Sequence, residues 1–176
     1  MVEKDSNLVS AIILTHNRVN LLKRAIDSVI NQTYPNIECI VVDNSSTDGT
    51  REYCLSRGDV RYIYCSPPEE TGNGCNYSRN IGIKACNGDL VALLDDDDYW
   101  MPTKIEKQVK LMQEKGCGVV YCGTKAEIVG EETRLEEWPV NHEKEGDMSK
   151  TCLLHPFVLT SQLLIKKRLA RICWFI

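Results

Sequence analysis

The chain has 176 residues, of which 43% are hydrophobic and 26% charged, a balance that is typical of a folded domain and excludes wholesale disorder. The formal net charge of −4 argues against nucleic acid as a partner, because nucleic-acid-binding domains normally carry a basic surface. The nine cysteines are scattered, and several of them (Cys39, Cys65 and Cys122) lie in apolar runs, so we expect free thiols rather than disulfides or a zinc site.

The N-terminal segment is charged early, and its apolar run is too short for a signal peptide or a membrane span. No internal run is long enough to cross a bilayer either. We therefore expect a cytoplasmic protein, whose contact with a membrane would be peripheral and at its inner face.

Short apolar runs alternate with amphipathic segments from the N-terminus to residue 116. This alternation predicts an α/β fold in which a mostly parallel sheet carries helices on both faces. The expected strands are residues 8–14, 36–43, 60–65 and 90–94, and the expected helices are residues 19–32, 50–57, 75–86 and 101–116.

Residues that cap or stop helices lie at several of these boundaries. Thr47 or Asp48 is expected to cap the second helix. Pro102 suits the first turn of the fourth helix, and Gly116 supplies its stop.

The pattern is less regular after residue 116. Residues 118–124 predict a fifth strand, and a hairpin is expected to turn at Gly130 and Glu131. Residues 139–150 are polar and are expected to form a loop, whereas residues 161–167 predict a late strand.

Polar side chains follow three of the expected parallel strands at the point where each strand ends. Parallel sheets bind ligands beyond the carboxyl ends of their strands, so these side chains should lie along one functional edge. They are Thr15, His16 and Asn17 after the first strand, Asp43 after the second and Asp95 to Asp98 after the fourth.

Four consecutive aspartates repel one another, and burying even one of them is costly unless a positive charge compensates it. A solvated surface loop is the simplest interpretation of such a run, but this run directly follows an apolar strand at the ligand-binding edge. Two carboxylates two residues apart can share one Mg²⁺ or Mn²⁺, which would bind an anionic substrate at the same time. Arg79 and Arg18 are the side chains expected to help hold that anion.

Several other sites lack their signature. The sequence has no G-x-x-x-x-G-K-[ST] phosphate loop, no G-x-G-x-x-G after the first strand and no G-x-S-x-G nucleophile elbow. A calcium loop over NSSTDG is excluded because Leu55 stands where the required glutamate would be.

The order and spacing of these pieces resemble the inverting family-two glycosyltransferases of the GT-A fold. The resemblance implies a Rossmann-like, mostly parallel sheet and a metal-assisted enzyme of the hexosyltransferase type, acting in polysaccharide biosynthesis. It also implies a nucleotide-diphosphate-sugar donor and Mg²⁺ or Mn²⁺ as cofactor. The resembling segments are VSAIILTHNR, IECIVVDNSSTDGT, SRNIGIKACNGDLVALLDDDDYWMPTKIEKQ and, more weakly, TSQLLIKK.

The resemblance also suggests roles for residues of the expected edge. It points to Thr15, His16 and Asp43 as contacts of the nucleotide base, and to Arg79 as a contact of the diphosphate. Each has a structural alternative: a strand-end cap, a surface loop histidine, a cap of the helix that follows SSTDGT, and a solvated helix residue, respectively.

The family's D-x-D motif maps onto Asp95 and Asp97. Asp97 is then the metal ligand, with Asp95 or Asp96 nearer the ribose and Asp95 as a second candidate ligand. Four aspartates in a row leave the register of the motif open by one position, and Asp98 is expected to be a solvated residue.

The resemblance divides the chain into a donor-binding part, residues 1–124, and a partial, truncated acceptor-side part, residues 125–176. RLARICWFI stands where the family's G-G-F-D-E-like stretch would begin, so the general base is expected to be absent from this chain. The apolar ending W-F-I suggests a cut through the fold or burial against a second copy of the chain.

Two functions of different class therefore remain open: a glycosyltransferase, and a donor-binding module without turnover of its own. A nucleotidyltransferase has the least support, because THNR is not the glycine-rich loop that such an enzyme carries after its first strand. The sequence does not name the sugar, the base or the acceptor, which could be a saccharide, a lipid-linked sugar or a protein.

Overall fold

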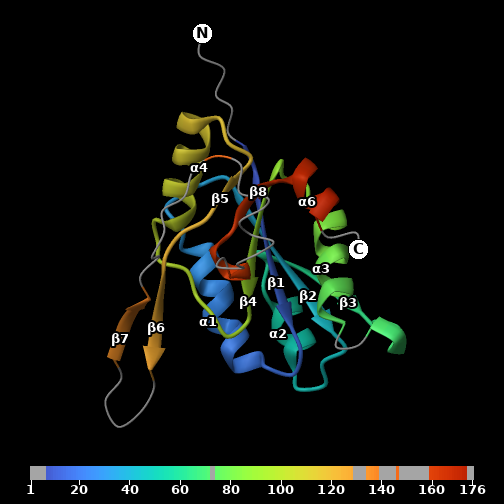
Figure 1. Cartoon of the computed structure of the whole chain (residues 1–176). Helices are drawn as coiled ribbons and strands as arrows, with labels where there is room; N and C mark the ends of the chain where they lie inside the picture. The colour runs from blue at the N-terminus through green and yellow to red at the C-terminus, as the bar shows by residue number, and fades with distance from the viewer. Residues whose placement is uncertain (1–6, 72–73, 129–133, 139–145, 147–158, 174–176) are drawn as a thin grey trace.

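The computed structural model describes residues 7–71, 74–128, 134–138, 146 and 159–173 (Figure 1). The strands are β1 Val9–Thr15, β2 Ile37–Asn44, β3 Val60–Cys65, β4 Leu90–Asp95, β5 Val119–Val120, β6 Thr124–Ile128, β7 Arg134–Trp138 and β8 Leu164–Lys166. The helices are α1 Val19–Ile30, α2 Thr50–Ser56, α3 Cys75–Ala85, α4 Lys104–Lys115 and α6 Lys167–Cys173, with short 3-10 turns η1 Glu69–Thr71 and η2 Thr160–Gln162.

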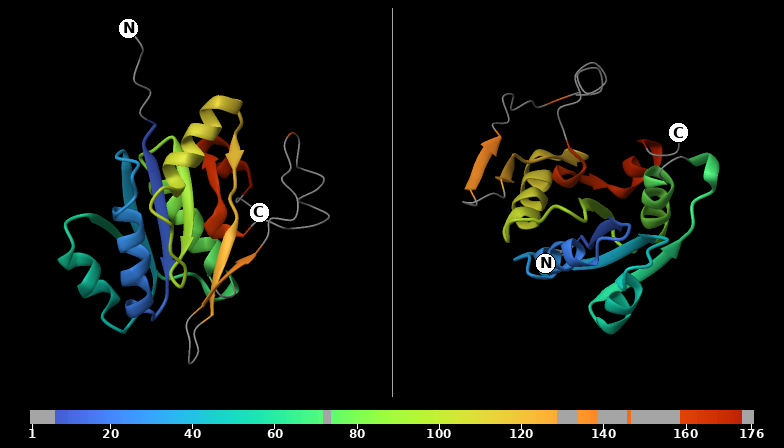
Figure 2. Two further views of the ribbon diagram at one scale, coloured as in Figure 1. Left: turned by 90° about the vertical axis from the view of Figure 1, so that its left-hand side faces the viewer. Right: turned by 90° about the horizontal axis from the view of Figure 1, so that it is seen from below.

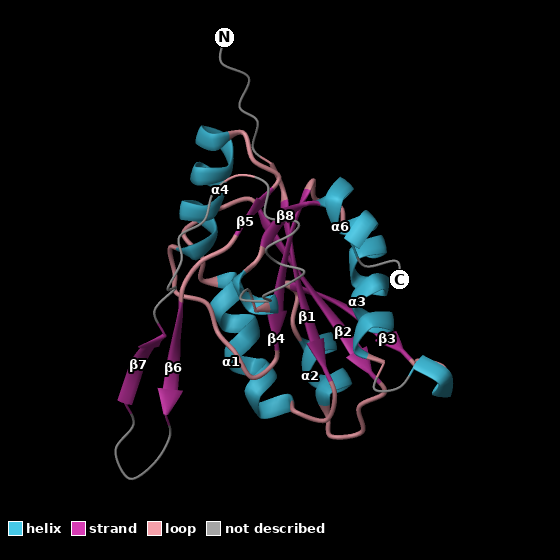
Figure 3. Cartoon of the chain, in the orientation of Figure 1, coloured by secondary structure: helices cyan, strands magenta, loops and turns pink. Residues whose placement is uncertain are grey.

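Six strands form one sheet in the order β3-β2-β1-β4-β8-β5 (Figure 3). The strands β1 to β4 are mutually parallel where they pair, and β8 lies antiparallel between β4 and β5. The expected α/β fold with a mostly parallel sheet is confirmed.

Helices cover both faces of this sheet, as Figures 1 and 2 show. On one face α1, α2 and α4 pack against alternate residues of β1, β2 and β4, and this cluster includes Ile26, Cys54 and Ile105. On the other face α3 and α6 contribute Ile83 and Ala170 to a second cluster. Strands that are buried on both faces read as continuous apolar runs rather than as alternating ones, which is why β1 and β4 were visible in the sequence.

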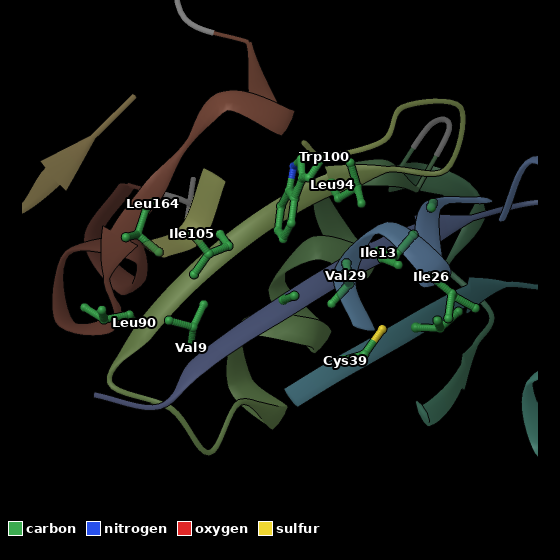
Figure 4. Packing of buried hydrophobic residues seen from close by; sticks show 14 of the residues in the cluster. Val9, Ile13, Ile26, Val29, Cys39, Leu90, Leu94, Trp100, Ile105 and Leu164 are labelled. Atoms are coloured by element: carbon green, nitrogen blue, oxygen red, sulfur yellow. The ribbon is translucent and has the colours of Figure 1, made fainter. Parts of the chain in front are cut away.

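The core reaches the end of the sheet at which the polar residues gather. Figure 4 shows Trp100, which follows the aspartates, in the same cluster as Leu94 of β4 and Ile105 of α4. Only 4% of the surface of Trp100 is exposed, so the segment after the aspartates is anchored in the core.

The strand register places the carboxyl ends of β1, β2 and β4 at one level. Thr15 pairs with Asp43, and Leu14 pairs with Asp95. The polar residues that end these strands therefore lie side by side along one edge, which we call the functional edge.

Two of the expected helix boundaries are shifted. The N-cap of α2 is Gly49, with a positive φ of 88°, rather than Thr47 or Asp48. Asp48 still holds this turn, because its Oδ1 accepts hydrogen bonds from the amide and the hydroxyl of Thr50. Pro102 precedes the helix that it was expected to begin, since α4 starts at Lys104.

The later strands are shorter than the sequence predicted. The fifth strand has two residues instead of seven, and Cys122 lies outside it. Among the described strands it pairs with β8, and this pairing involves Val119 and Val120 alone. The late strand is likewise limited to Leu164–Lys166, because η2 occupies the residues before it and α6 begins immediately after it.

Strands β6 and β7 form the expected hairpin, whose turn at Gly130 and Glu131 lies outside the described residues. Most of the expected loop at 139–150 and the apolar ending at 174–176 also lie outside them. Among the described residues, seven cysteines form no disulfide: Cys39, Cys54, Cys65, Cys75, Cys86, Cys117 and Cys122. None of the helices found there has the length and apolarity needed to span a bilayer.

Candidate functional site

Asp96 is the anchor of the acidic run. Its Oδ2 accepts a 2.8 Å hydrogen bond from the Thr15 hydroxyl, and its Oδ1 lies 3.2 Å from Nη1 of Arg18. The residue is only 5% exposed. Both of its carboxylate oxygens are thus engaged by the chain itself, which ties the end of β4 to the end of β1.

Arg18 supplies the positive charge that the aspartates need. Its Nη1 also lies 3.0 Å from Oδ2 of Asp97, so one guanidinium nitrogen bridges two neighbouring carboxylates. The attraction of Asp96, followed by that of Asp97, raises the pKa of Arg18 above its ordinary value. Unlike Asp96, Asp97 leaves 53% of its side chain exposed.

Asp95 faces a second arginine. Nη2 of Arg79, on α3, lies 3.9 Å from its Oδ1, and Nη1 of the same residue donates to Asn76. The Arg79 side chain is 10% exposed, whereas 44% of the Asp95 side chain is open to solvent. Arg79 is therefore a buried cation beside an accessible carboxylate, and not the solvated helix residue of the alternative interpretation.

The charge balance at Asp95 favours a further cation. Burial raises the pKa of its carboxyl group, Arg79 opposes that effect, and the neighbouring aspartates, Asp98 foremost, add to the rise. A divalent cation would offset this repulsion. Asp95, Asp97 and Asp98 are accessible, and Asp95 and Asp97 flank Asp96, which is buried and fully engaged.

Among the described residues, no three acidic, histidine or cysteine side chains converge into a complete metal-binding cluster. Mg²⁺ and Mn²⁺ are often bound by one or two carboxylates together with water and substrate phosphate. Asp95 and Asp97 would suit such a shared site, whose remaining ligands would come from outside the chain.

Asp43 is placed at the edge but is closed off. It is fully buried, its Oδ2 accepts a 2.7 Å hydrogen bond from the Tyr62 hydroxyl, and its Oδ1 accepts the amide of Ser46. These contacts hold the turn after β2 and do not cap α2, whose N-cap is Gly49, so the alternative role of Asp43 as a helix cap is wrong. Its contact with a nucleotide base stays a prediction.

His16 and Asn17 join the loops that follow β1 and β2. His16 Nδ1 lies 2.5 Å from the Asn44 carbonyl oxygen, and Asn17 has a positive φ of 52°. Oδ1 of Asn17 accepts the backbone amide of Thr47, and the backbone amide of Asn17 donates to the Ser46 hydroxyl. This cross-loop network fixes the backbone beside the aspartates, and the sequence pattern suggested only that Asn17 lies at the edge.

The sequence did not predict that Ser161 holds the acidic run in place. Ser161, in η2, accepts the Asp95 amide on its hydroxyl at 3.1 Å. Its carbonyl accepts the indole N–H of Trp100 at 3.0 Å, and the Ser28 hydroxyl accepts the Trp100 amide. A segment 66 residues away in sequence therefore shapes the loop, and no local pattern in the sequence signals that contact.

A family model described as "Glycosyl transferase family 2" matches residues 10–172. An uncharacterized glycosyltransferase of Rickettsia typhi is 42% identical over 121 residues, which are 67% of this chain and 36% of that protein. A UDP-Glc:alpha-D-GlcNAc-diphosphoundecaprenol beta-1,3-glucosyltransferase of Escherichia coli, WfaP, is 38% identical over 111 residues, 60% of this chain and 41% of that protein.

Solved structures show the same fold. TarS 1-349 of S. aureus superposes with a TM-score of 0.72 at 20% identity, over 94% of this chain and 48% of that one. The mannosyltransferase PcManGT of Pyrobaculum calidifontis, solved with GDP-Man and Mn²⁺, gives a TM-score of 0.66 at 21% identity, over 97% of this chain and 48% of that one.

These known proteins are longer than the chain, which spans 36% of the Rickettsia typhi relative and 48% of TarS 1-349. The family match nevertheless covers nearly all of the sequence, including the acidic run and the η2 turn whose Ser161 bonds it. The chain belongs to glycosyl transferase family 2 and has the GT-A fold of its structural neighbours.

Proposed function

We propose that this chain is the donor-binding part of a transferase that moves a sugar from a nucleotide-diphosphate donor to an acceptor hydroxyl with inversion. The observation that carries the proposal is the functional edge itself. There the ends of β1 and β4 are bonded through Thr15 and Asp96, which leaves Asp95 and Asp97 accessible beside two arginines. Such an arrangement suits an anionic ligand that brings its own cation.

The nucleotide would lie along the ends of β1 and β2. Thr15 and His16 are proposed to line the base, with Asp43 behind them as a contact that must share its oxygen with Tyr62. Arg79, held by α3 beside Asp95, is proposed to face the diphosphate. Arginine suits this role because its guanidinium can form two parallel hydrogen bonds to phosphate oxygens.

Asp97, with Asp95 as its partner, would hold Mg²⁺ or Mn²⁺, and Asp96 positions both of them. The cation supplies Lewis-acid stabilisation of the negative charge that develops on the leaving diphosphate. The residues of the chain contribute by orienting the donor. The hydrogen bond between Thr15 and Asp96 fixes the acidic loop against the end of β1, and the bond from the Asp95 amide to Ser161 fixes it against η2.

Inversion requires a general base on the acceptor side of the sugar, which takes the proton from the attacking hydroxyl. Residues 148–176 contain neither aspartate nor glutamate. We therefore infer that the base is not provided by the late strand, α6 or their flanking residues. This observation also favours the second candidate, a donor-binding module that has no turnover without additional sequence.

The names of similar proteins support a proposal for the donor and the acceptor. The E. coli relative is named for UDP-Glc and a diphosphoundecaprenol-linked acceptor, and a TarS structure contains UDP-GlcNAc. We propose a uridine-diphosphate sugar as donor and a lipid-linked saccharide as acceptor, which would bring the protein to the inner face of a membrane. On this proposal residues 1–124 bind the donor and residues 125–176 begin the acceptor side.

Thermal unfolding with UDP or GDP, each with and without Mn²⁺, tests the donor site. A ligand at one hundred times its Kd that binds only the folded chain stabilises it by about 2.7 kcal/mol. We expect UDP with Mn²⁺ to raise the Tm more than either alone. Unchanged melting curves under all conditions would contradict the donor site.

Asp97→Asn and Asp98→Asn form a matched pair for the metal assignment. Both remove one charge from the same exposed loop, but only Asp97 pairs with Arg18 and is proposed to hold the cation. We expect Asp97→Asn to lose the Mn²⁺-dependent part of the Tm shift and Asp98→Asn to keep it. The opposite pattern would move the metal ligand by one residue.

Sugar transfer from UDP-sugars separates the two candidate functions. The assay compares this chain with the full open reading frame that encodes it. Turnover by both proteins supports an enzyme whose base lies within these residues. Binding by both proteins but turnover only by the longer one supports a donor-binding module that is completed elsewhere.

A further inference from the structure

The position of Arg18 has a consequence for how a cation enters the site. Its backbone is fixed at the start of α1, where its carbonyl accepts the amides of Leu21 and Leu22 at 3.0 Å. Its side chain is 52% exposed and bridges Asp96 and Asp97 through one nitrogen. The guanidinium therefore extends from a fixed backbone position to an end that is accessible to solvent.

The two ends of this bridge differ. The Asp96 side chain is 7% exposed and keeps a second bond, from Thr15, that does not depend on Arg18. The Asp97 side chain is 53% exposed, and Arg18 is the side chain that pairs with its carboxylate in the described structure. Opening the bridge at Asp97 costs little, because exposed ion pairs contribute little net free energy, whereas Asp96 remains held in either case.

We propose that Arg18 is a positioning residue that occupies the cation position at Asp97 in the donor-free chain and releases Asp97 when donor and cation bind together. The inference rests on the proposed function. Mn²⁺ alone must compete with the guanidinium for Asp97. With a nucleoside diphosphate present, the guanidinium gains another anionic partner, so the carboxylate becomes available.

This arrangement couples the two ligands. Arg18 makes the site a poor binder of free divalent cations and a better binder of cation together with nucleotide. Because coupling between two ligands is reciprocal, UDP must tighten Mn²⁺ by the same factor as Mn²⁺ tightens UDP. Removing the competing guanidinium should reduce this factor.

The test measures free Mn²⁺ by electron paramagnetic resonance, with and without UDP, for the wild type and Arg18→Gln. Without nucleotide, Arg18→Gln should bind Mn²⁺ about three- to tenfold more tightly, the range expected when one exposed charge pair is removed. The ratio of the two Mn²⁺ dissociation constants, without and with UDP, should shrink by at least the same factor.

Arg24→Gln is the matched control. Arg24 lies beside the same loop, where it bonds the Asp97 carbonyl oxygen at 3.3 Å and pairs with Glu127, but it does not pair with an aspartate carboxylate of the run. The Arg24→Gln substitution removes the same charge as Arg18→Gln. It should change Mn²⁺ affinity by less than about twofold, because the charge is screened by solvent. Arg18→Lys, which keeps a point charge but loses the fork, should fall between Arg18→Gln and the wild type.

The results separate the role of Arg18 from the existence of the donor site. Equal Mn²⁺ affinity in the wild type and a folded Arg18→Gln protein overturns the role of Arg18 while leaving the donor site in place. Equal gains in Arg18→Gln and Arg24→Gln also overturn it, since the effect would then be net charge. Absence of Mn²⁺ binding in every protein, even with UDP, contradicts the proposed function instead.

Discussion

The two ends of the sheet treat their carboxylates differently. At the amino ends of β1 and β2, Glu38 accepts hydrogen bonds from the Ser10 hydroxyl, from the Asn87 amide at 2.8 Å and from the Asn87 side chain at 2.9 Å. The Gly88 amide lies 3.3 Å from the same carboxylate. Burial alone would raise the pKa of Glu38, but these hydrogen bonds outweigh it and lower the pKa below its ordinary value.

At the carboxyl ends, the acids are satisfied unevenly. Asp96 is saturated like Glu38, but Asp95 and Asp97 are accessible, and repulsion within the run adds to the burial that raises the pKa of Asp95. The fold therefore uses Glu38 and Asp96 for its own stability and leaves Asp95 and Asp97 available to a ligand. A closed carboxylate, whose oxygens are bonded within the chain, should matter for stability. An open carboxylate, which is accessible to solvent, should matter for binding.

The largest stability effect is expected at Lys104, a buried cation behind the acidic loop. Its Nζ bonds Gln108 and lies 4.2 Å from the centre of the Trp100 ring. Burial lowers its pKa from 10.5 to about 8. Because the ammonium group is buried, its charged form destabilises the folded state.

The sign of its pH dependence follows from proton linkage. Between pH 8 and 10.5 the unfolded chain keeps the proton of Lys104 and the folded chain has lost it. The free energy of unfolding should therefore rise with pH through this window, by about 3 kcal/mol from this residue. Urea unfolding of the wild type and Lys104→Met across this pH range checks the prediction. The cysteine thiols titrate in both proteins, so the difference between the two stability curves isolates Lys104. Parallel curves would show that Lys104 is not a buried cation.

Glu38→Ala should have the next largest effect. It leaves the amide and side chain of Asn87 without their acceptor, which should lower the free energy of unfolding by about 2 kcal/mol. The Gly88 amide keeps its 2.9 Å bond to the Ser10 hydroxyl. The Tm shift produced by UDP and Mn²⁺ should be unchanged. A loss of that shift in a folded variant would show that the two ends of the sheet are not independent.

Glu38→Gln gives a smaller, pH-dependent version of the same test. Because the folded pKa of Glu38 lies below 4.5, its charge stabilises the fold above that pH, and the contribution is lost as the pH falls. The stability difference between wild type and variant should be largest near neutral pH and shrink on acidification. A difference that grows in acid would contradict the assignment.

The smallest stability effect is expected for Asp97→Asn. Its ion pair with Arg18 is exposed, so the free energy of unfolding should change by less than about 0.5 kcal/mol. Chemical unfolding of the wild type and the variant, without ligand, checks this. A large destabilisation would place Asp97 with the closed acids and remove the contrast on which the site assignment rests.

Local pattern was sufficient to predict the fold up to residue 116. Strands such as β1 and β4 are buried on both faces and therefore appear as apolar runs, and their alternation with helices places Thr15 and the aspartates at one edge. The glycine that ends α4, Gly116, was also predictable, because its positive φ of 63° suits a residue without Cβ.

The parts that were not predictable depend on contacts between distant segments. Ser161 reaches the Asp95 amide across 66 positions, and the pairing of β5 with β8 decides that only two of the expected seven residues are a strand. Arg18 was expected to hold an anionic ligand, but its bridge between two carboxylates depends on side-chain geometry that periodicity does not encode.

A crystal structure of the chain with UDP and Mn²⁺ would show whether the exposed aspartates hold the cation and the donor. We predict Mn²⁺ between the Asp97 carboxylate and the diphosphate, Asp96 still bonded to Thr15, and Arg18 no longer on Asp97. A complex in which UDP binds away from this edge, with Arg18 still paired to Asp97 and no cation nearby, would contradict the account.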